Sequence, residues 1–113
     1  LVSAKRKIFE MKMASVKDDE KCPVFFEDGL EPFELRLFAD MLMEKFPSAA
    51  VFCGNDEEGY KYAIGSNKAD VVLFIKEANN ALNGKGGGKG NMVQGSFAAK
   101  ADEIERYVWN GLK

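Results

Sequence analysis

The segment GKGGGKGNMVQGSF, residues 84 to 97, limits the folds open to this chain more than any other feature. Six glycines and two lysines stand in it. Glycine loses more backbone freedom on folding than any other residue, so an ordered segment of this kind must need bare main chain at several points. Two interpretations are open: a mobile, solvated linker in which the glycines supply turns, or a loop kept bare so that a ligand can approach it.

The well-known phosphate-binding glycine loops have fixed spacings, and this segment matches neither of them. GxxxxGK[ST] fails because Lys89 stands at the sixth position from Gly84, and GxGxxG fails because Asn91 stands where the last glycine is required. Both motifs also follow a strand and open a helix, whereas this segment follows a predicted helix and precedes a predicted strand. A P-loop or dinucleotide-binding enzyme is therefore disfavoured.

The chain as a whole predicts one domain of mixed helix and sheet. Its 113 residues, 46% of them hydrophobic, suit a single core. No apolar run approaches the roughly 20 residues that span a bilayer, so no membrane partner is expected. The first residues, Leu1 to Lys5, lack an initiator methionine and indicate a piece cut from a longer protein.

Hydrophobic periodicity and turn residues predict eight elements. They are helices over residues 1–16, 32–46, 69–82 and 100–112, and strands over 23–28, 48–54, 60–66 and 91–97. The segment 69–82 also suits a strand, because VVLFI has strand propensity, but its length and later alanines favour a helix. After the N-terminal helix the order is β-α-β-β-α-β-α, which predicts an α/β or α+β fold with helices packed on a small three- to four-stranded sheet.

Several side chains have predicted places in this fold. Core positions are expected for Phe25, Phe26, Phe33, Phe38 and Phe46. Trp109 lies off the core face of the last helix and is either an interface residue or a partly covered one. Cys22 and Cys53 have no zinc-site spacing, so we predict two buried free thiols of a cytoplasmic protein rather than a metal site or a disulfide.

The net charge of −2 is unevenly distributed along the chain. Residues 5 to 17 carry five basic side chains and one acid, and residues 84 to 100 carry three lysines and no acid. The first stretch is interpreted as a solvated helix face in preference to an RNA-binding extension. In the second, Lys85 and Lys89 stand beside the amides of Asn91 and Gln94, a combination that suits an anion on a nucleotide or RNA backbone.

The residues LNGKGGGKGNMVQGSF, followed by KADEIERYV, resemble the closing motif of the DHH-associated C-terminal domain. The form they resemble occurs in alanyl-tRNA synthetases and in free-standing alanyl-tRNA editing proteins of the AlaX type. DGLEPFELRLFADML is similar to the first helix of that domain, so the resemblance covers residues 22–113, with residues 1–17 as an N-terminal helical extension. Related phosphoesterases typically end the glycine motif in histidine; Lys89 stands there instead, which favours the alanyl-tRNA branch.

The resemblance implies a non-catalytic domain that binds tRNA, with the tRNA for alanine as partner and a homodimer as a further option. The parent's editing chemistry is implied to use zinc in a separate upstream domain, and no cofactor is expected in this fragment, which has no histidine. Asp102 and Glu103, the nearest approach to a catalytic carboxylate pair, are better explained as acids at a helix start. The alternatives are the substrate-binding domain of a DHH-type nucleotide phosphoesterase, or a dimerisation module.

The expected RNA-binding residues all lie in the glycine segment. Phosphate contacts are assigned to Lys85 and Lys89, close backbone approach to Gly86, Gly87, Gly88 and Gly90, and contacts to sugar or base edges to Asn91 and Gln94, with Gly95 beside them. Gln94 and Gly95 could equally be required by the strand alone.

Overall fold

The computed structural model describes residues 2–112, and side chains from residue 5 onward. Leu1, the first residue of the predicted N-terminal extension, and Lys113, the last residue of the predicted domain, lie outside this range, as do the side chains of residues 2–4 in the predicted N-terminal helix. The elements in chain order are α1 (Val2–Ala14), β1 (Val24–Glu27), α2 (Pro32–Lys45), β2 (Ser48–Asn55), β3 (Gly59–Ser66), α3 (Val71–Ala81), β4 (Gly84–Lys89), β5 (Met92–Phe97) and α4 (Ala101–Leu112).

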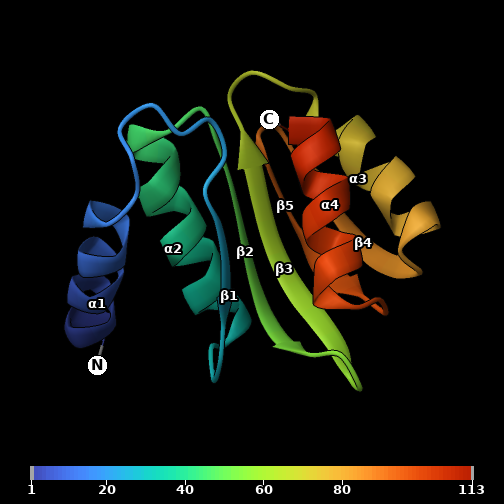
Figure 1. The fold of residues 1–113 in the computed structure, drawn as a ribbon, viewed down its shortest axis with the longest axis horizontal. Helices are drawn as coiled ribbons and strands as arrows, with labels where there is room; N and C mark the ends of the chain where they lie inside the picture. Colours follow the sequence, from blue (N-terminus) through green and yellow to red (C-terminus); the bar gives the residue numbers. More distant parts are fainter. Residues whose placement is uncertain (1, 113) are drawn as a thin grey trace.

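A five-stranded sheet forms the centre of the domain, in the order β1-β2-β3-β5-β4. β1 is parallel to β2, to which α2 connects it, and the other neighbouring strands are antiparallel. Helices α1 and α2 lie on one side of the sheet and α3 and α4 on the other (Figure 1). The predicted mixed fold is confirmed, and so is the helix over residues 69–82, whose start is capped by Asp70 accepting from the Leu73 N–H.

One predicted element is wrong, because the glycine segment is not a loop. Residues 84–89 form the strand β4, which raises the strand count from the predicted three or four to five. Strand propensity argues against this assignment, since glycine has no side chain to pack on a sheet. Tertiary contacts across the hairpin, described below, override that propensity.

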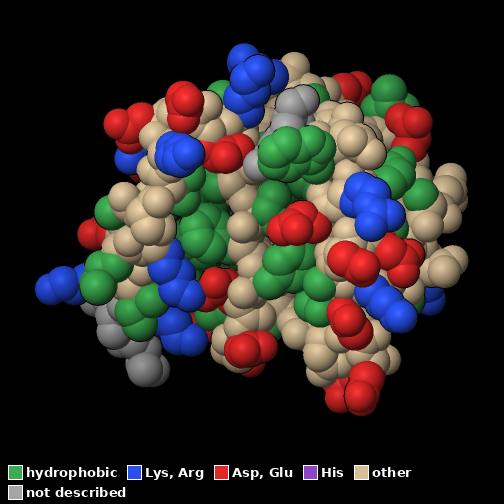
Figure 2. All heavy atoms as spheres, in the orientation of Figure 1, with side chains coloured by type: hydrophobic (Ala, Val, Ile, Leu, Met, Phe, Trp, Pro, Cys, Tyr) green, Lys and Arg blue, Asp and Glu red, His purple; other side chains and the backbone are tan. Residues whose placement is uncertain are grey.

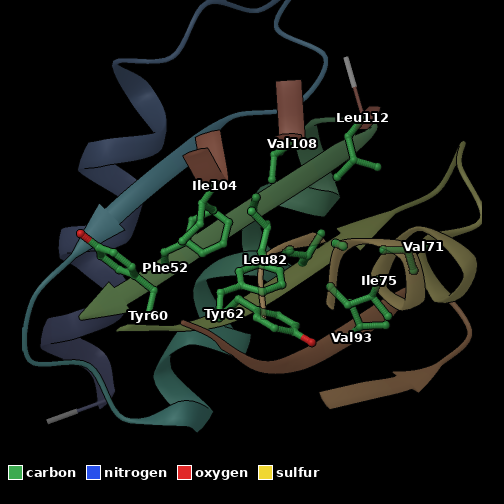
Figure 3. Close-up of a cluster of buried hydrophobic side chains, with 14 of the residues drawn as sticks. Phe52, Tyr60, Tyr62, Val71, Ile75, Leu82, Val93, Ile104, Val108 and Leu112 are labelled. Atoms are coloured by element: carbon green, nitrogen blue, oxygen red, sulfur yellow. The ribbon is translucent and has the colours of Figure 1, made fainter. Parts of the chain in front are cut away.

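Two hydrophobic clusters hold the helices to the two faces of the sheet. On one face, side chains of β2, β3 and β5 pack against α3 and α4; Figure 3 shows Phe52, Tyr60, Tyr62, Val71, Ile75, Leu82, Val93, Ile104, Val108 and Leu112 from this cluster. On the other face, Phe9 of α1 stacks on Phe38 of α2 with ring centroids 4.3 Å apart. The N-terminal helix is therefore packed on the domain.

The predicted aromatic core is only partly correct. Phe38 and Phe46 are buried, and Phe25 and Phe26 are half-buried against the two clusters. Phe33 is 62% exposed, so its assignment to the core is wrong. It lies in the first turn of α2, next to the buried Glu34 and Leu35, so its side chain is on the uncovered side of that turn.

Neither Cys22 nor Cys53 forms a disulfide within the described residues, as predicted. Cys22 is buried, whereas Cys53 is only half-buried, so full burial of the second thiol is wrong. Within residues 2–112 we find no helix that is both long and apolar enough to cross a membrane.

Asp56, in the turn between β2 and β3, ties that turn to the start of α4. Its carboxylate accepts hydrogen bonds from the Ala101 N–H at 2.9 Å and from the Tyr60 hydroxyl at 2.7 Å. The Ala101 N–H, followed by the Tyr60 hydroxyl, lowers the pKa of Asp56. The bond to Asp56 and then burial raise the pKa of Tyr60 from 10.0 to about 12.

The raised pKa of Tyr60 predicts a loss of stability in alkaline solution. Between pH 10 and about 12 the unfolded chain has released the Tyr60 proton while the folded chain keeps it. The folded state then binds more protons, so the free energy of unfolding falls as pH rises through this window, and the contribution is fully present below it. Urea unfolding followed by circular dichroism measures this fall. The free energy of unfolding of Tyr60→Phe should fall less over this pH range. An equal fall in both proteins would contradict a raised pKa of Tyr60.

Candidate nucleic-acid interface

The candidate interface is the hairpin formed by β4 and β5, which pair along their whole length. The two strands are joined by Gly90 and Asn91 at the tip, and Gly90 has φ +68°. A glycine with positive φ at the first central position is typical of a type II′ turn, whose twist matches that of the flanking strands. This glycine is therefore required by the turn.

Close backbone contacts explain most of the other glycines in the hairpin. A Cβ added to Gly86, where φ is +137°, would stand 2.4 Å from the Gln94 carbonyl oxygen and 2.7 Å from the Tyr62 hydroxyl. A Cβ added to Gly95 would stand 2.1 Å from the Lys85 carbonyl oxygen. The Tyr62 ring thus occupies space that side chains would otherwise fill, in the way that aromatic residues compensate for strand glycines. These glycines are needed for folding, whether or not a ligand binds.

Gly87 is the exception within β4. A Cβ added there would meet no heavy atom within 4 Å, and its φ is not in the glycine-only range. The fold itself does not require glycine at this position.

Strand alternation divides the predicted RNA-binding residues between the two faces of the sheet. Gly86 pairs with Gly95 and Gly88 with Val93, on the face that carries α3. Gly87 pairs with Gln94, on the opposite face. Lys85 and Lys89 share the face of Gly87, because successive side chains of a strand point to opposite sides. The structure therefore brings together Lys85, Gly87, Lys89 and Gln94, and separates them from Gly86, Gly88 and Gly95.

A third lysine joins this face from β3. Lys61 pairs with Ser96, and Ser96 pairs with Lys85, so the three residues form one row across the sheet. Strand spacing puts Lys61 about 10 Å from Lys85, and strand rise puts Lys89 about 13 Å from Lys85. We call Lys61, Lys85 and Lys89 the lysine face. Sequence reasoning missed Lys61; the alternation in YKYAIGS shows which side of β3 it lies on, but not its neighbours.

The lysine face is exposed to solvent. α2 packs on β2 and β3, whereas α3 covers β4 from the other side of the sheet. All three lysines of the face are exposed. The five ion pairs found among residues 5–112 use other cations, namely Lys5, Arg6, Lys12, Arg36 and Lys45. β4 is also the end strand of the sheet, so no described strand pairs its outer edge.

The two predicted amides each make a bond within the domain. The Asn91 side chain donates to the Asn67 side chain at 2.8 Å, which holds the hairpin tip to the end of β3. The Gln94 side chain donates to the Pro32 carbonyl oxygen at 3.0 Å, which links β5 to the first turn of α2. Both amides are thereby held in place rather than mobile.

The basic N-terminal stretch has acidic partners within the domain. Lys5 lies 3.2 Å from Glu34, and Lys12 is ion-paired with Glu27. The pKa of Glu34 is lowered, mainly by the hydrogen bond from the Glu31 N–H, and Lys5 lowers it further. Lys5 and Lys12 are therefore paired within the domain rather than only solvated, and this pairing argues against an RNA-binding extension.

A surface groove lies at the opposite edge of the sheet, over β1 and α4. It has a volume of about 560 Å³ and includes Trp109, which is 59% exposed. Glu20, Asp102 and Glu105 line it together with one cation, Arg106. Figure 2 views the molecule from this side, where hydrophobic and acidic side chains lie next to each other. An acidic groove repels a polyanion, so its size does not make it the better RNA site.

Among residues 2–112 no three Cys, Asp or Glu side chains are grouped so that they could hold a metal ion. Asp102 and Glu103 lie in the first turn of α4, the position predicted for them.

Comparisons with known proteins agree with the fold and the motif. Residues 14–109 match the model of the DHHA1 domain. The chain is 28% identical over 93 residues to an alanine–tRNA ligase of Acholeplasma laidlawii (strain PG-8A), a match that covers 81% of this chain and 11% of the ligase.

The fold is shared with solved structures, among them a C-Ala domain and a RecJ protein. The C-Ala domain of alanyl-tRNA synthetase from Aquifex aeolicus has a TM-score of 0.67 and 24% identity, with 84% of this chain and 94% of that chain covered. RecJ from Thermus thermophilus, crystallised with Mg²⁺, has a TM-score of 0.65 and 13% identity, with 93% of this chain and 16% of that chain covered.

Proposed function

The chain belongs to the DHHA1 domain family, as its glycine motif indicated, and on this premise we propose that it is a non-catalytic domain that binds tRNA. The proposed parent is a longer protein that handles alanyl-tRNA, either a synthetase or an editing hydrolase. The alanine–tRNA ligase and the C-Ala domain to which the chain is similar support this proposal.

The observation that carries the proposal is the lysine face. Three exposed ammonium groups project from a rigid sheet, and no described acid is ion-paired with them. The backbone positions of Lys61 and Lys89 lie about 10 and 13 Å from that of Lys85, which is wider than one phosphate group and suits separate phosphates along a nucleic-acid backbone better than a single small anion. Phosphate contacts of this kind provide affinity without sequence specificity.

A salt titration of tRNA binding tests this proposal. For each lysine that contacts phosphate, replacement with alanine should reduce the slope of log K against log salt by about 0.7 to 0.9, because fewer counterions are released. We therefore expect Lys85→Ala and Lys89→Ala each to lower the slope, and the addition of Lys61→Ala to lower it further. Fluorescence anisotropy of labelled tRNA at several salt concentrations measures both affinity and slope.

Lys76 provides the matched control. It is an exposed lysine of α3, on the other side of the sheet, so Lys76→Ala should leave the slope unchanged. If the Lys85 and Lys89 variants kept the slope of the unmodified chain, the lysine face would not be the interface. Mononucleotides titrated in parallel should bind far more weakly than tRNA; equal affinity would favour the alternative, a substrate-binding domain of a nucleotide phosphoesterase.

A further inference from the structure

Phe33 is an exposed aromatic side chain on a rigid support. The turn beneath it contains Pro32 at the start of α2 and a capping box, in which Glu31 and Glu34 each bond the backbone N–H of the other. Proline and a capping box both fix the first turn of a helix. The ring is 62% exposed although its backbone is fixed, so little conformational freedom remains to be lost when a ligand contacts it.

The first turn of α2 lies at the border of the lysine face. The Gln94 side chain bonds the Pro32 carbonyl oxygen, and Gln94 lies directly opposite Gly87 in the β4–β5 pair. Lys85 and Lys89 flank Gly87 two positions away on the same side of the strand. Phe33, adjacent to Pro32 in the chain, is therefore joined to the lysine face through one hydrogen bond.

Gly87 leaves open surface between the two lysines of β4. A side chain could be accommodated there, since nothing lies within 4 Å of its Cβ position, yet the residue is glycine. Open surface at this point lets the backbone of a nucleic acid lie close to the sheet between two ammonium groups.

We propose that Phe33 stacks on an unpaired base of an RNA whose phosphates are bound by Lys85 and Lys89, and that the nucleotide crosses the sheet over Gly87. This inference rests on the proposed function and adds the class of substrate: RNA with an unstacked base. Inside a regular duplex each base face is covered by its neighbours, so away from the duplex ends an aromatic ring gains a stacking surface only where a base is unpaired and unstacked. The lysines contact phosphate, which single strands and duplexes both carry, so the lysines do not distinguish the two.

Binding of two RNAs to the 113-residue chain tests the inference. The probes are a single-stranded RNA of roughly twelve nucleotides and the same strand paired with its complement, a length within the usual footprint of one small domain. Phe33→Ala should lower affinity for the single strand about tenfold, a typical effect of removing one base–aromatic stack, and should change duplex affinity little. Its salt slope should equal that of the unmodified chain because Phe33 carries no charge.

Three further variants sharpen the test. Phe33→Tyr retains a ring and should keep most of the affinity, while Leu73→Ala, at a similarly exposed apolar residue of α3, should bind as the unmodified chain does. Valine is well tolerated in a β-strand, so Gly87→Val should fold. It should weaken binding of the single-stranded RNA severalfold, because its side chain blocks the open surface.

The outcomes separate this inference from the proposed function. If Phe33→Ala binds the single strand as tightly as the unmodified chain while the Lys85 and Lys89 variants bind weakly, the stacking role is wrong and the RNA-binding role stands. If Gly87→Val binds normally, the path over Gly87 is wrong. If the unmodified chain binds neither RNA nor tRNA, the proposed function and the inference both fail.

Discussion

Replacing Gly86 with alanine is expected to destabilise the domain by about 3 kcal/mol, through a steric clash and through backbone strain. The added Cβ would lie 2.4 Å from the Gln94 carbonyl oxygen and 2.5 Å from the Gly95 Cα, both of them backbone atoms of the paired strand. A φ of +137° is also strained for any residue with a side chain. Relief would require β4 and β5 to separate, which would break the pairing that forms the hairpin.

Gly87→Ala is the matched control, one position along the same strand. The added Cβ meets nothing within 4 Å, so no clash is expected. The free energy of unfolding should stay unchanged or rise by about 0.5 kcal/mol, because alanine reduces the conformational freedom of the unfolded chain. Urea unfolding followed by circular dichroism compares the two variants. Equal destabilisation by both substitutions would show that the pairing of β4 with β5 is incorrect.

The second large effect is expected for Phe38→Ala, at about 3–5 kcal/mol. Phe38 is fully buried and contacts two rings, Phe9 at 4.3 Å and Phe25 at 4.9 Å between centroids. Removing it leaves a cavity where α1, α2 and β1 meet. Small domains are stable by only about 5–15 kcal/mol, so this substitution removes a large fraction of the free energy of unfolding.

Phe33→Ala is the control on the same helix. Its ring is largely in water, so the free energy of unfolding should change by no more than about 0.5 kcal/mol. Thermal and urea unfolding of the two variants side by side measure the difference. A large loss of stability in Phe33→Ala would mean that the ring packs in the domain, and it would remove Phe33 as a free stacking surface.

The mixed fold could be predicted because its signals are local. The second predicted helix begins with Pro32 and ends before Pro47, and apolar residues recur along it at helical spacing. The alternation around Tyr60, Tyr62 and Ile64 identifies a strand within a few residues. Such periodicities depend only on neighbours in the chain, so the sequence is enough to detect them.

The strand β4 could not be predicted, because its stability does not come from its own residues. Glycines have low strand propensity, and the reason for them lies in contacts with Gln94, Gly95 and Tyr62, which are remote or reached across a turn. Phe33 was misassigned for a related reason. Helical spacing gives the direction of a side chain around the axis, but not whether another part of the chain covers that side chain.

The sequence by itself determined the order of most elements, the family, and the presence of two lysines among glycines. Each of these features depends only on residues close together in the chain. Tertiary structure alone decided which glycines the fold needs, which residues share a face, and that Lys61 joins Lys85 and Lys89. Strand pairing decides these points, because it places residues more than twenty positions apart in a single row, and no local pattern encodes which strands become neighbours.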